Sequence, residues 1–194
     1  MGLPLSRWAR LGLLCRSLVI RRLVVMPVKS QMEVFCYISM SVKQLTLTSY
    51  SLAAAILLMK RSKAIELGQP IMAKFCGATV AGVPPRIMGI GPSVAIPKLL
   101  AKFQLTKDDI DIIEVNEAFA SMAVYCLNVL GLDHKKVNPR GGAIALGHPL
   151  GATGARQICT ILSEARRTKK KICLTSMCIG TGQGMAGLLV NEQV

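Results

Sequence analysis

Three short stretches carry the side chains with which this sequence could do chemistry. The longest, residues 141–156, opens on a glycine pair and presents His148 between Gly147 and Pro149. Pro149 fixes its own φ and biases His148 away from the helical region, while Gly147 lets the backbone approach a ligand closely. A histidine held on such a rigid bend can act as a general base or an oxyanion donor. It could also be a loop histidine without a role.

The other two stretches each follow an expected strand. Residues 116–119 read Asn-Glu-Ala-Phe, and Asn116 could either cap the following helix or point its amide into the crevice beyond the strand end. Residues 178–182 read Cys-Ile-Gly-Thr-Gly. A thiol beside glycine amides and an imidazole can have a lowered pKa, so that Cys178 could move protons or attack a carbonyl. A buried cysteine that only fills space is the other interpretation.

Two further patterns do not carry a site. Residues 182–187 match a dinucleotide fingerprint, but too few residues follow them to form the helix and second strand that such a fold needs. His148, Cys173 and Cys178 lack the ligand number and spacing of a metal centre. We therefore expect neither a dinucleotide nor a metal ion.

Strands and helices alternate along the part of the chain that must position these residues. The hydrophobic patterns and Gly/Pro breaks predict a Pro/Gly-rich loop at 83–92. They predict strands at 52–58, 71–80, 111–115, 172–178 and 185–190, and helices at 62–67, 93–105, 117–130 and 151–167. This order indicates an α/β layer with a largely parallel sheet.

Charge and composition narrow the classes of partner. The 194 residues are 52% hydrophobic and carry a formal net charge of +14, which favours polyanions such as nucleic acid, anionic lipid or a phosphate-bearing cofactor. Only 4% of residues are aromatic, so few side chains could stack on bases and we expect no nucleic-acid binding. The most apolar stretch, 11–28, is interrupted by three arginines, so we expect no transmembrane span.

The first 45 residues differ from the rest. They hold seven Lys or Arg and one acidic residue, which is typical of an organelle transit peptide, although an N-terminus unrelated to the fold would look the same. We expect residues 1–45 to be a basic leader, disordered or partly helical, and residues 46–194 to be the folded domain. Seven cysteines without a Cys-x-x-Cys pair are interpreted as reduced, mostly buried thiols.

The three stretches together resemble the C-terminal half of the thiolase family. Residues 116–120, 141–156 and 178–182 each match a family signature, in the family's order, and the resemblance covers about residues 52–190. Residues 83–85 and 88–92 resemble in particular the 3-ketoacyl-CoA thiolases of peroxisomal type. The resemblance implies a thiolase-like layered α/β fold, the C-terminal repeat only, with a mixed, mostly parallel sheet and helices on its faces.

The resemblance also implies a role for four residues. His148 would deprotonate a nucleophilic cysteine and later polarise the thioester oxygen, and Asn116 would hold a water that completes this oxyanion hole. Cys178 would be a second acid/base, and the Gly180 amide would contribute to a second oxyanion hole. The implied reaction cleaves a 3-ketoacyl-CoA in fatty-acid β-oxidation, with coenzyme A as co-substrate and no permanently bound cofactor.

One part of the family pattern has no match. The nucleophilic cysteine of the family lies on a strand-to-helix turn in the N-terminal half, and Cys15, Cys36 and Cys76 stand in no such setting. We therefore expect a truncated thiolase chain that is inactive in isolation. The alternative is a non-catalytic form that binds CoA or docks onto a full-length thiolase. The resemblance favours a homo-oligomer in the peroxisome, whereas the leader composition favours the mitochondrion.

Overall fold

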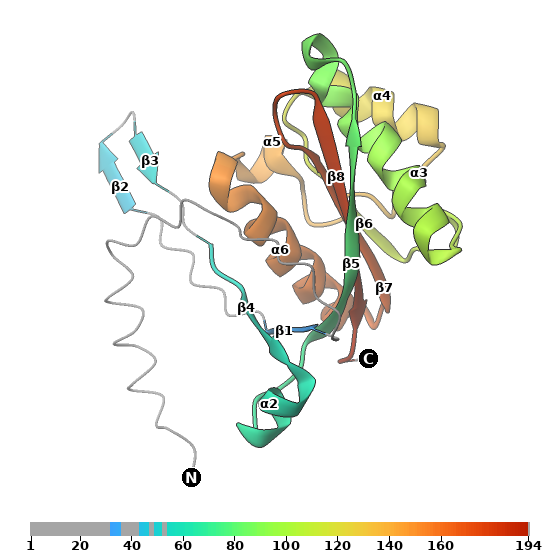
Figure 1. The fold of residues 1–194 in the computed structure, drawn as a ribbon. Coiled ribbons are helices and arrows are strands. Elements are labelled where there is room, and N and C mark those ends of the chain that lie inside the picture. The colour runs from blue at the N-terminus through green and yellow to red at the C-terminus, as the bar shows by residue number, and fades with distance from the viewer. Residues whose placement is uncertain (1–31, 36–42, 47–48, 52–53, 194) are drawn as a thin grey trace.

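The computed structural model describes residues 54–193 and the backbone of three short strands at 32–35, 43–46 and 49–51 (Figure 1). The expected leader lies largely outside the described residues, as do Cys15 and Cys36. The boundary between residues 45 and 46 stays a prediction. No helix in the described part of the chain is long and apolar enough to cross a membrane.

A six-stranded sheet forms the centre of the fold (Figure 1). Its strands, in spatial order, are β4 (Leu57–Lys60), β1 (Met32–Phe35), β5 (Ala73–Gly82), β8 (Gln183–Asn191), β7 (Ile172–Cys178) and β6 (Ile112–Val115). Two further strands, β2 (Lys43–Thr46) and β3 (Ser49–Ser51), form a separate antiparallel pair.

The sheet is mixed, as expected, but the prediction that it is mostly parallel is wrong. Among the described strands only β6 and β7 pair in parallel. The three strands β5, β6 and β7 do run in the same direction, but β8 inserts between β5 and β7 and pairs with both antiparallel. The cause is the short turn from β7 to β8, because a connection of a few residues can only form a hairpin.

Helices cover both faces of this sheet (Figure 1). In chain order the helices are α2 (Arg61–Glu66), the 3₁₀ helix η2 (Pro85–Ile90), α3 (Gly91–Phe103), α4 (Ala120–Leu130), α5 (Ala143–Leu146), the 3₁₀ turn η3 (Leu150–Ala152) and α6 (Thr153–Thr168). Successive side chains of a strand point to opposite faces of the sheet, so the residues of β6 contribute alternately to the two parts of the hydrophobic core. Ile113 packs with Leu99 of α3, while Ile112 packs with Ile161 of α6.

Most predicted elements are present, several of them with shifted ends. The strand predicted at 172–178 is β7, and the helix predicted at 151–167 is α6 preceded by η3. The expected loop at 83–92 instead contains η2 and the first turn of α3. Pro85 and Pro92 stand at the beginnings of these helices, where a missing N–H costs nothing and a fixed φ is favourable. Proline there starts helices as well as breaking them.

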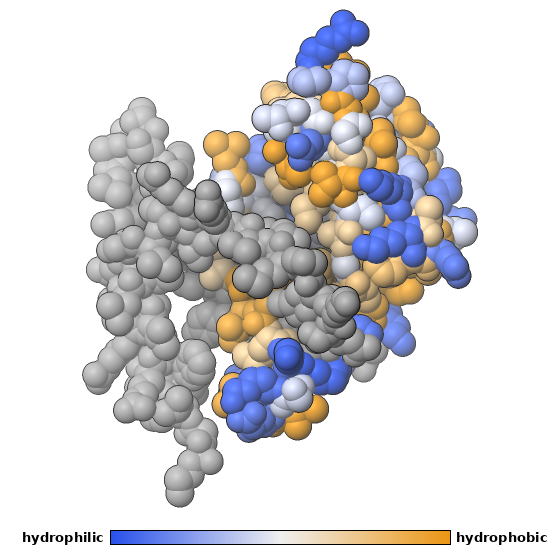
Figure 2. Space-filling model, in the orientation of Figure 1, coloured by the Kyte–Doolittle hydropathy of each residue, from blue (hydrophilic) through white to orange (hydrophobic). Residues whose placement is uncertain are grey.

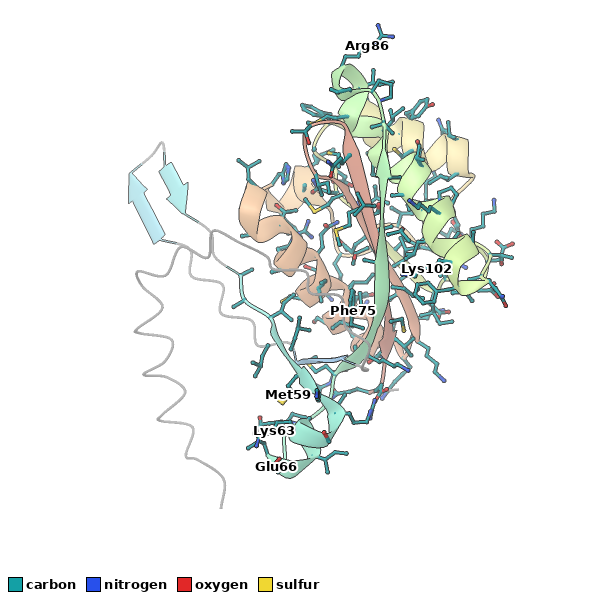
Figure 3. The ribbon with its side chains drawn as sticks, viewed as in Figure 1. Met59, Lys63, Glu66, Phe75, Arg86 and Lys102 are labelled. Carbon is teal, nitrogen blue, oxygen red and sulfur yellow. The ribbon has the colours of Figure 1, made fainter. Side chains whose placement is uncertain are left out.

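Polar contacts fasten α3 to β5. Lys102 donates a hydrogen bond from Nζ to the Ala78 carbonyl at 3.2 Å, and Lys98 donates to the Val80 carbonyl at 2.8 Å (Figure 3). At the upper end of this strand in Figure 3, Arg86 of η2 marks the edge of the sheet where β5 ends. The carboxyl ends of β6 and β7 lie at the same edge because the three strands run in one direction.

Gly184 allows α3 and β8 to approach each other closely. A Cβ built on Gly91 would stand 2.6 Å from the Gly184 Cα, and one built on Gly184 would collide with the backbone of Gly91. Glycine in the 182–187 stretch therefore serves packing. We expect Gly184→Ala to lower the free energy of unfolding by about 2–4 kcal/mol, because backbone atoms must move. Urea denaturation would measure this loss.

Gly82→Ala is the matched control for this substitution. Gly82 ends the neighbouring strand β5, and a Cβ there would meet nothing within 4 Å. Its unfolding midpoint should stay close to that of the unchanged chain. Equal midpoints for the two variants would show that the close approach is not needed.

Candidate functional site

Asn116 and Cys178 lie at one edge of the sheet. Asn116 is the first residue after β6, and Cys178 is the last residue of β7. These two strands pair in parallel, and the Asn116 amide continues the pairing by donating to the Ser176 carbonyl at 2.9 Å. Ligands of α/β sheets bind beyond such carboxyl ends.

Asn138 holds the chain in place immediately before Asn116. Its Oδ1 accepts a hydrogen bond from the Val115 amide and its Nδ2 donates to the Val115 carbonyl, both at 2.9 Å. The Asn138 side chain thus satisfies both backbone groups of Val115 on the edge strand β6, as a neighbouring strand would. Sequence reasoning missed this residue, for which the only local signal was an Asn-Pro turn dipeptide.

Glu117 joins this support to the glycine loop. Its Oε1 accepts from Asn138 Nδ2 at 2.8 Å, and its Oε2 accepts from the Ile144 amide at 3.0 Å. Gly142 makes room for the carboxylate, since a Cβ at that position would collide with it. Glu117 therefore positions both Asn116, its neighbour, and the segment that leads to His148.

The structure brings His148 into contact with Asn116. Asn116 Nδ2 lies 3.3 Å from His148 Nε2, and His148 Nδ1 lies 2.7 Å from the hydroxyl of Thr153, the first residue of α6. With the amide in this orientation Nδ2 donates to Nε2, and the matching imidazole tautomer carries its proton on Nδ1, which donates to the Thr153 hydroxyl. In this tautomer Nε2 at the sheet edge is the unprotonated nitrogen, which is the form that a general base requires.

Asn116 also carries an unsatisfied acceptor. The residue is fully buried, and its Oδ1 has no hydrogen-bond partner within the described part of the chain. Buried polar atoms of this kind normally bind a partner or an ordered water. A water on Oδ1 would stand beside the imidazole, where it could donate to a developing oxyanion.

Cys178 lies at the same edge, but its thiol packs on the α4 side. It is buried in a small cluster with Met122 and Cys126, against which Ala118 also packs. Burial raises the pKa of the Cys178 thiol, partly opposed by a hydrogen bond from its own backbone amide. The expectation of a lowered pKa is therefore wrong, because apolar side chains surround the sulfur.

Gly180 lies in the turn between β7 and β8. Its φ of 81° is in the left-handed region, its carbonyl accepts from the Gln183 amide at 3.0 Å, and a Cβ there would meet nothing within 4 Å. Within residues 54–193, no hydrogen bond joins Cys178 or Gly180 to the Asn116–His148 pair. The second histidine, His134, is exposed in the 131–138 turn region.

A buried ion pair lies behind the site. Arg156 of α6 donates from Nη1 to Glu114 Oε2 of β6 at 3.2 Å, and both side chains are at least 94% buried. Gln157 donates to the carbonyls of Glu114 and Ser176, both at 3.3 Å, so α6 holds the ends of β6 and β7 together. Burial raises the pKa of Glu114 to about 7, although the guanidinium of Arg156 favours the charged form.

The raised pKa of Glu114 predicts a pH-dependent stability. Between pH 4.5, the ordinary value, and about 7, the folded chain keeps a proton that the unfolded chain has lost. A rise in pH through this window should therefore lower the free energy of unfolding, by about 2–3 kcal/mol, and have no further effect through Glu114 above it. Urea denaturation from pH 4.5 to 8 measures this slope.

Two glutamine variants show which carboxyl group causes this pH dependence of stability. Glu114→Gln should remove this part of the pH dependence, and above about pH 7 it also leaves Arg156 without its counter-ion and lowers stability there. Glu66→Gln, which changes an exposed carboxylate on α2, should keep it. A slope that survives Glu114→Gln would assign the titration to another group.

The described residues offer no metal centre. Within them, no group of three His, Cys, Asp or Glu side chains is placed to hold an ion. The described cysteines, Cys76, Cys126, Cys159, Cys173 and Cys178, form no disulfides with one another, and all but Cys76 are buried.

Comparison with known proteins finds a family that matches the part of the chain containing this edge. Residues 69–191 match the family model described as thiolase, C-terminal domain. The chain is similar to the peroxisomal 3-ketoacyl-CoA thiolase of Yarrowia lipolytica (59% identity over 140 residues, 72% of this chain and 34% of that protein). It is also similar to the peroxisomal 3-ketoacyl-CoA thiolase of Homo sapiens (60% over 137 residues, 70% and 32%). The chain spans about a third of the length of these relatives.

Two solved structures have a similar fold over the aligned part of the chain. The dimeric peroxisomal thiolase of Saccharomyces cerevisiae aligns with a TM-score of 0.67 at 55% identity, covering 71% of this chain and 35% of that one. The acetyl-CoA acetyltransferase of Bacillus anthracis aligns with a TM-score of 0.68 at 39% identity, covering 72% and 37%.

Proposed function

Because the chain belongs to the thiolase family, we propose that it serves the cleavage of a 3-ketoacyl-CoA by CoA, in which the acyl group passes from carbon 2 to a cysteine thiol and then to CoA. The products are acetyl-CoA and a shortened acyl-CoA, as in fatty-acid β-oxidation. The names of its relatives support this reaction and a peroxisomal location. Coenzyme A is then a co-substrate, and no permanently bound cofactor is needed.

The contact between Asn116 and His148 is the observation that supports this proposal most. In the first step, His148 Nε2 takes the proton of a nucleophilic cysteine, and the thiolate attacks the 3-keto carbon. The protonated Nε2 then becomes a donor beside the water held by Asn116 Oδ1. Together these donors stabilise the oxyanion of the acyl-thioester step.

Cys178 and Gly180 supply the second half of the chemistry. When the bond between carbons 2 and 3 breaks, the carbanion of the departing acetyl-CoA needs a proton and an oxyanion donor. A thiol whose pKa is raised is protonated beforehand, so Cys178 can give its proton to that carbon. It recovers one from the incoming CoA thiol, while the Gly180 amide faces the enolate oxygen.

A second candidate function is a non-catalytic partner of an intact thiolase. Of the three cysteines considered as nucleophile, Cys76 is the one that the structure describes, and it lies on β5 within the part that matches the C-terminal domain. Large apolar side chains are also exposed around the site, among them Phe119, Leu146 and Leu150. Such a surface suits docking onto another thiolase chain, and the dimeric yeast structure supports a homo-oligomer.

A chimera separates the two functions. In it, the stretch of the Yarrowia lipolytica thiolase that matches this chain is replaced by the corresponding residues of the chain. If the chain carries competent acid/base groups, thiolysis of a 3-ketoacyl-CoA should stay within about tenfold of the parent enzyme. The isolated 194-residue chain should show negligible thiolysis.

The outcomes point in different directions. A folded chimera without activity would favour the non-catalytic partner, which co-purification of the unaltered chain with an intact thiolase would support. Turnover by the isolated chain that is lost on changing Cys15, Cys36 or Cys76 would contradict the expectation that it lacks a nucleophile.

A further inference from the structure

A cavity of about 220 Å³ lies beside α6, which contributes half of its lining residues. Its lining includes two arginines, Arg140 and Arg156, and two hydroxyl side chains of α6, Thr160 and Ser163. Leu146 contributes an apolar wall. Four donors in a space of this size could hold a small ligand rich in acceptors.

Arg156 lines this cavity, and two of its three guanidinium nitrogens carry no hydrogen bond within residues 54–193. Its Nη1 binds Glu114, but its Nε and Nη2 are buried without a partner in the described part of the chain. These two nitrogens form one edge of the planar guanidinium, with two N–H groups side by side. That edge matches the two oxygens of a carboxylate or a phosphate in a bidentate pair.

Arg140 provides a second cation that is only weakly held. It lies 3.5 Å from Glu164, whose carboxylate already receives two hydrogen bonds from Arg167, at 2.6 and 2.9 Å. About half of the Arg140 side chain is exposed, so it can turn toward a ligand at little cost. The two acidic residues nearby are thus each paired with an arginine.

We propose that this cavity binds a small oxyanion, with the Nε–Nη2 edge of Arg156 as its bidentate partner and Arg140 closing over it. Thr160 and Ser163 can donate the remaining hydrogen bonds. The proposal goes beyond acyl transfer and does not rest on it, since the cavity is lined by neither His148 nor Cys178.

The test is a titration of the 194-residue chain with inorganic phosphate or acetate, against sodium chloride at matched ionic strength. Side-chain N–H resonances of arginine report the binding, and Arg156→Lys identifies the Nε–H signal of Arg156. We expect a saturable shift of that signal over the millimolar range. Tighter binding of phosphate would identify the ligand as a phosphate group, and tighter binding of acetate would identify it as a carboxylate.

Two surface variants make the result specific. Arg140→Gln should weaken the binding about tenfold, because it removes a charge-assisted hydrogen bond and leaves the ion pair of Arg156 in place. Arg166→Gln removes an exposed arginine of the same helix and should change it less than twofold. No saturable shift, or equal weakening by both variants, would overturn the proposal.

Discussion

Replacing His148 by alanine in the chimeric thiolase should lower kcat for thiolysis by about 10³-fold or more. The imidazole has two successive roles in the proposed reaction, since Nε2 first takes a proton and then donates a hydrogen bond. Removal of a general base typically costs 10²–10⁴ in rate, and the loss of the donor adds to it. The substrate constant KM should change much less.

The chain contains a matched control, because it has two histidines. His134 is exposed, and its side chain makes none of the contacts described at the sheet edge. His134→Ala should therefore leave both kcat and KM unchanged. Similar losses for the two variants would mean that the Nε2 of His148 takes no part in the reaction.

Replacing Cys178 by alanine should lower kcat by about 10²–10³-fold. The thiol is the proposed proton donor to the carbon of the departing acetyl-CoA, and removal of such an acid typically costs about 10²–10⁴ in rate. Cys178→Ser should recover little of the activity, since a hydroxyl is a far weaker acid than a thiol. The measurement is the initial rate of thiolysis at saturating CoA.

Cys126→Ala controls for the change in packing. Cys126 is buried in the same cluster as Cys178, and burial raises its pKa as well, so its removal leaves a similar cavity. It should lower thermal stability about as much as Cys178→Ala does while kcat stays within about threefold. Equal losses of activity would reduce the role of Cys178 to packing.

The site could be predicted in part from the sequence because its residues stand at breaks in the hydrophobic pattern. Asn116 follows a buried strand and His148 stands among glycines, and the structure joins them at 3.3 Å. The support of the site could not be predicted. Asn138 acts through a contact with Val115, 23 residues away, and no local pattern encodes such a pairing.

The sheet shows a similar limit. Alternating strands and helices predict a largely parallel sheet, and β5, β6 and β7 do run in one direction, but the alternation does not say which strands are neighbours. That order depends on β8, whose short connection to β7 makes it enter between two strands of the opposite direction. The raised pKa of Cys178 depends in the same way on α4, which covers it from a distant part of the chain.

A double-mutant cycle on Asn116 and His148 in the chimera tests the central claim most directly. The claim is that the amide and the imidazole act as one unit at the sheet edge. Asn116→Ala should lower kcat about 10²–10³-fold, and the double variant should be little slower than His148→Ala alone, because the amide acts through the imidazole and its water. Losses that simply multiply in the double variant would contradict it.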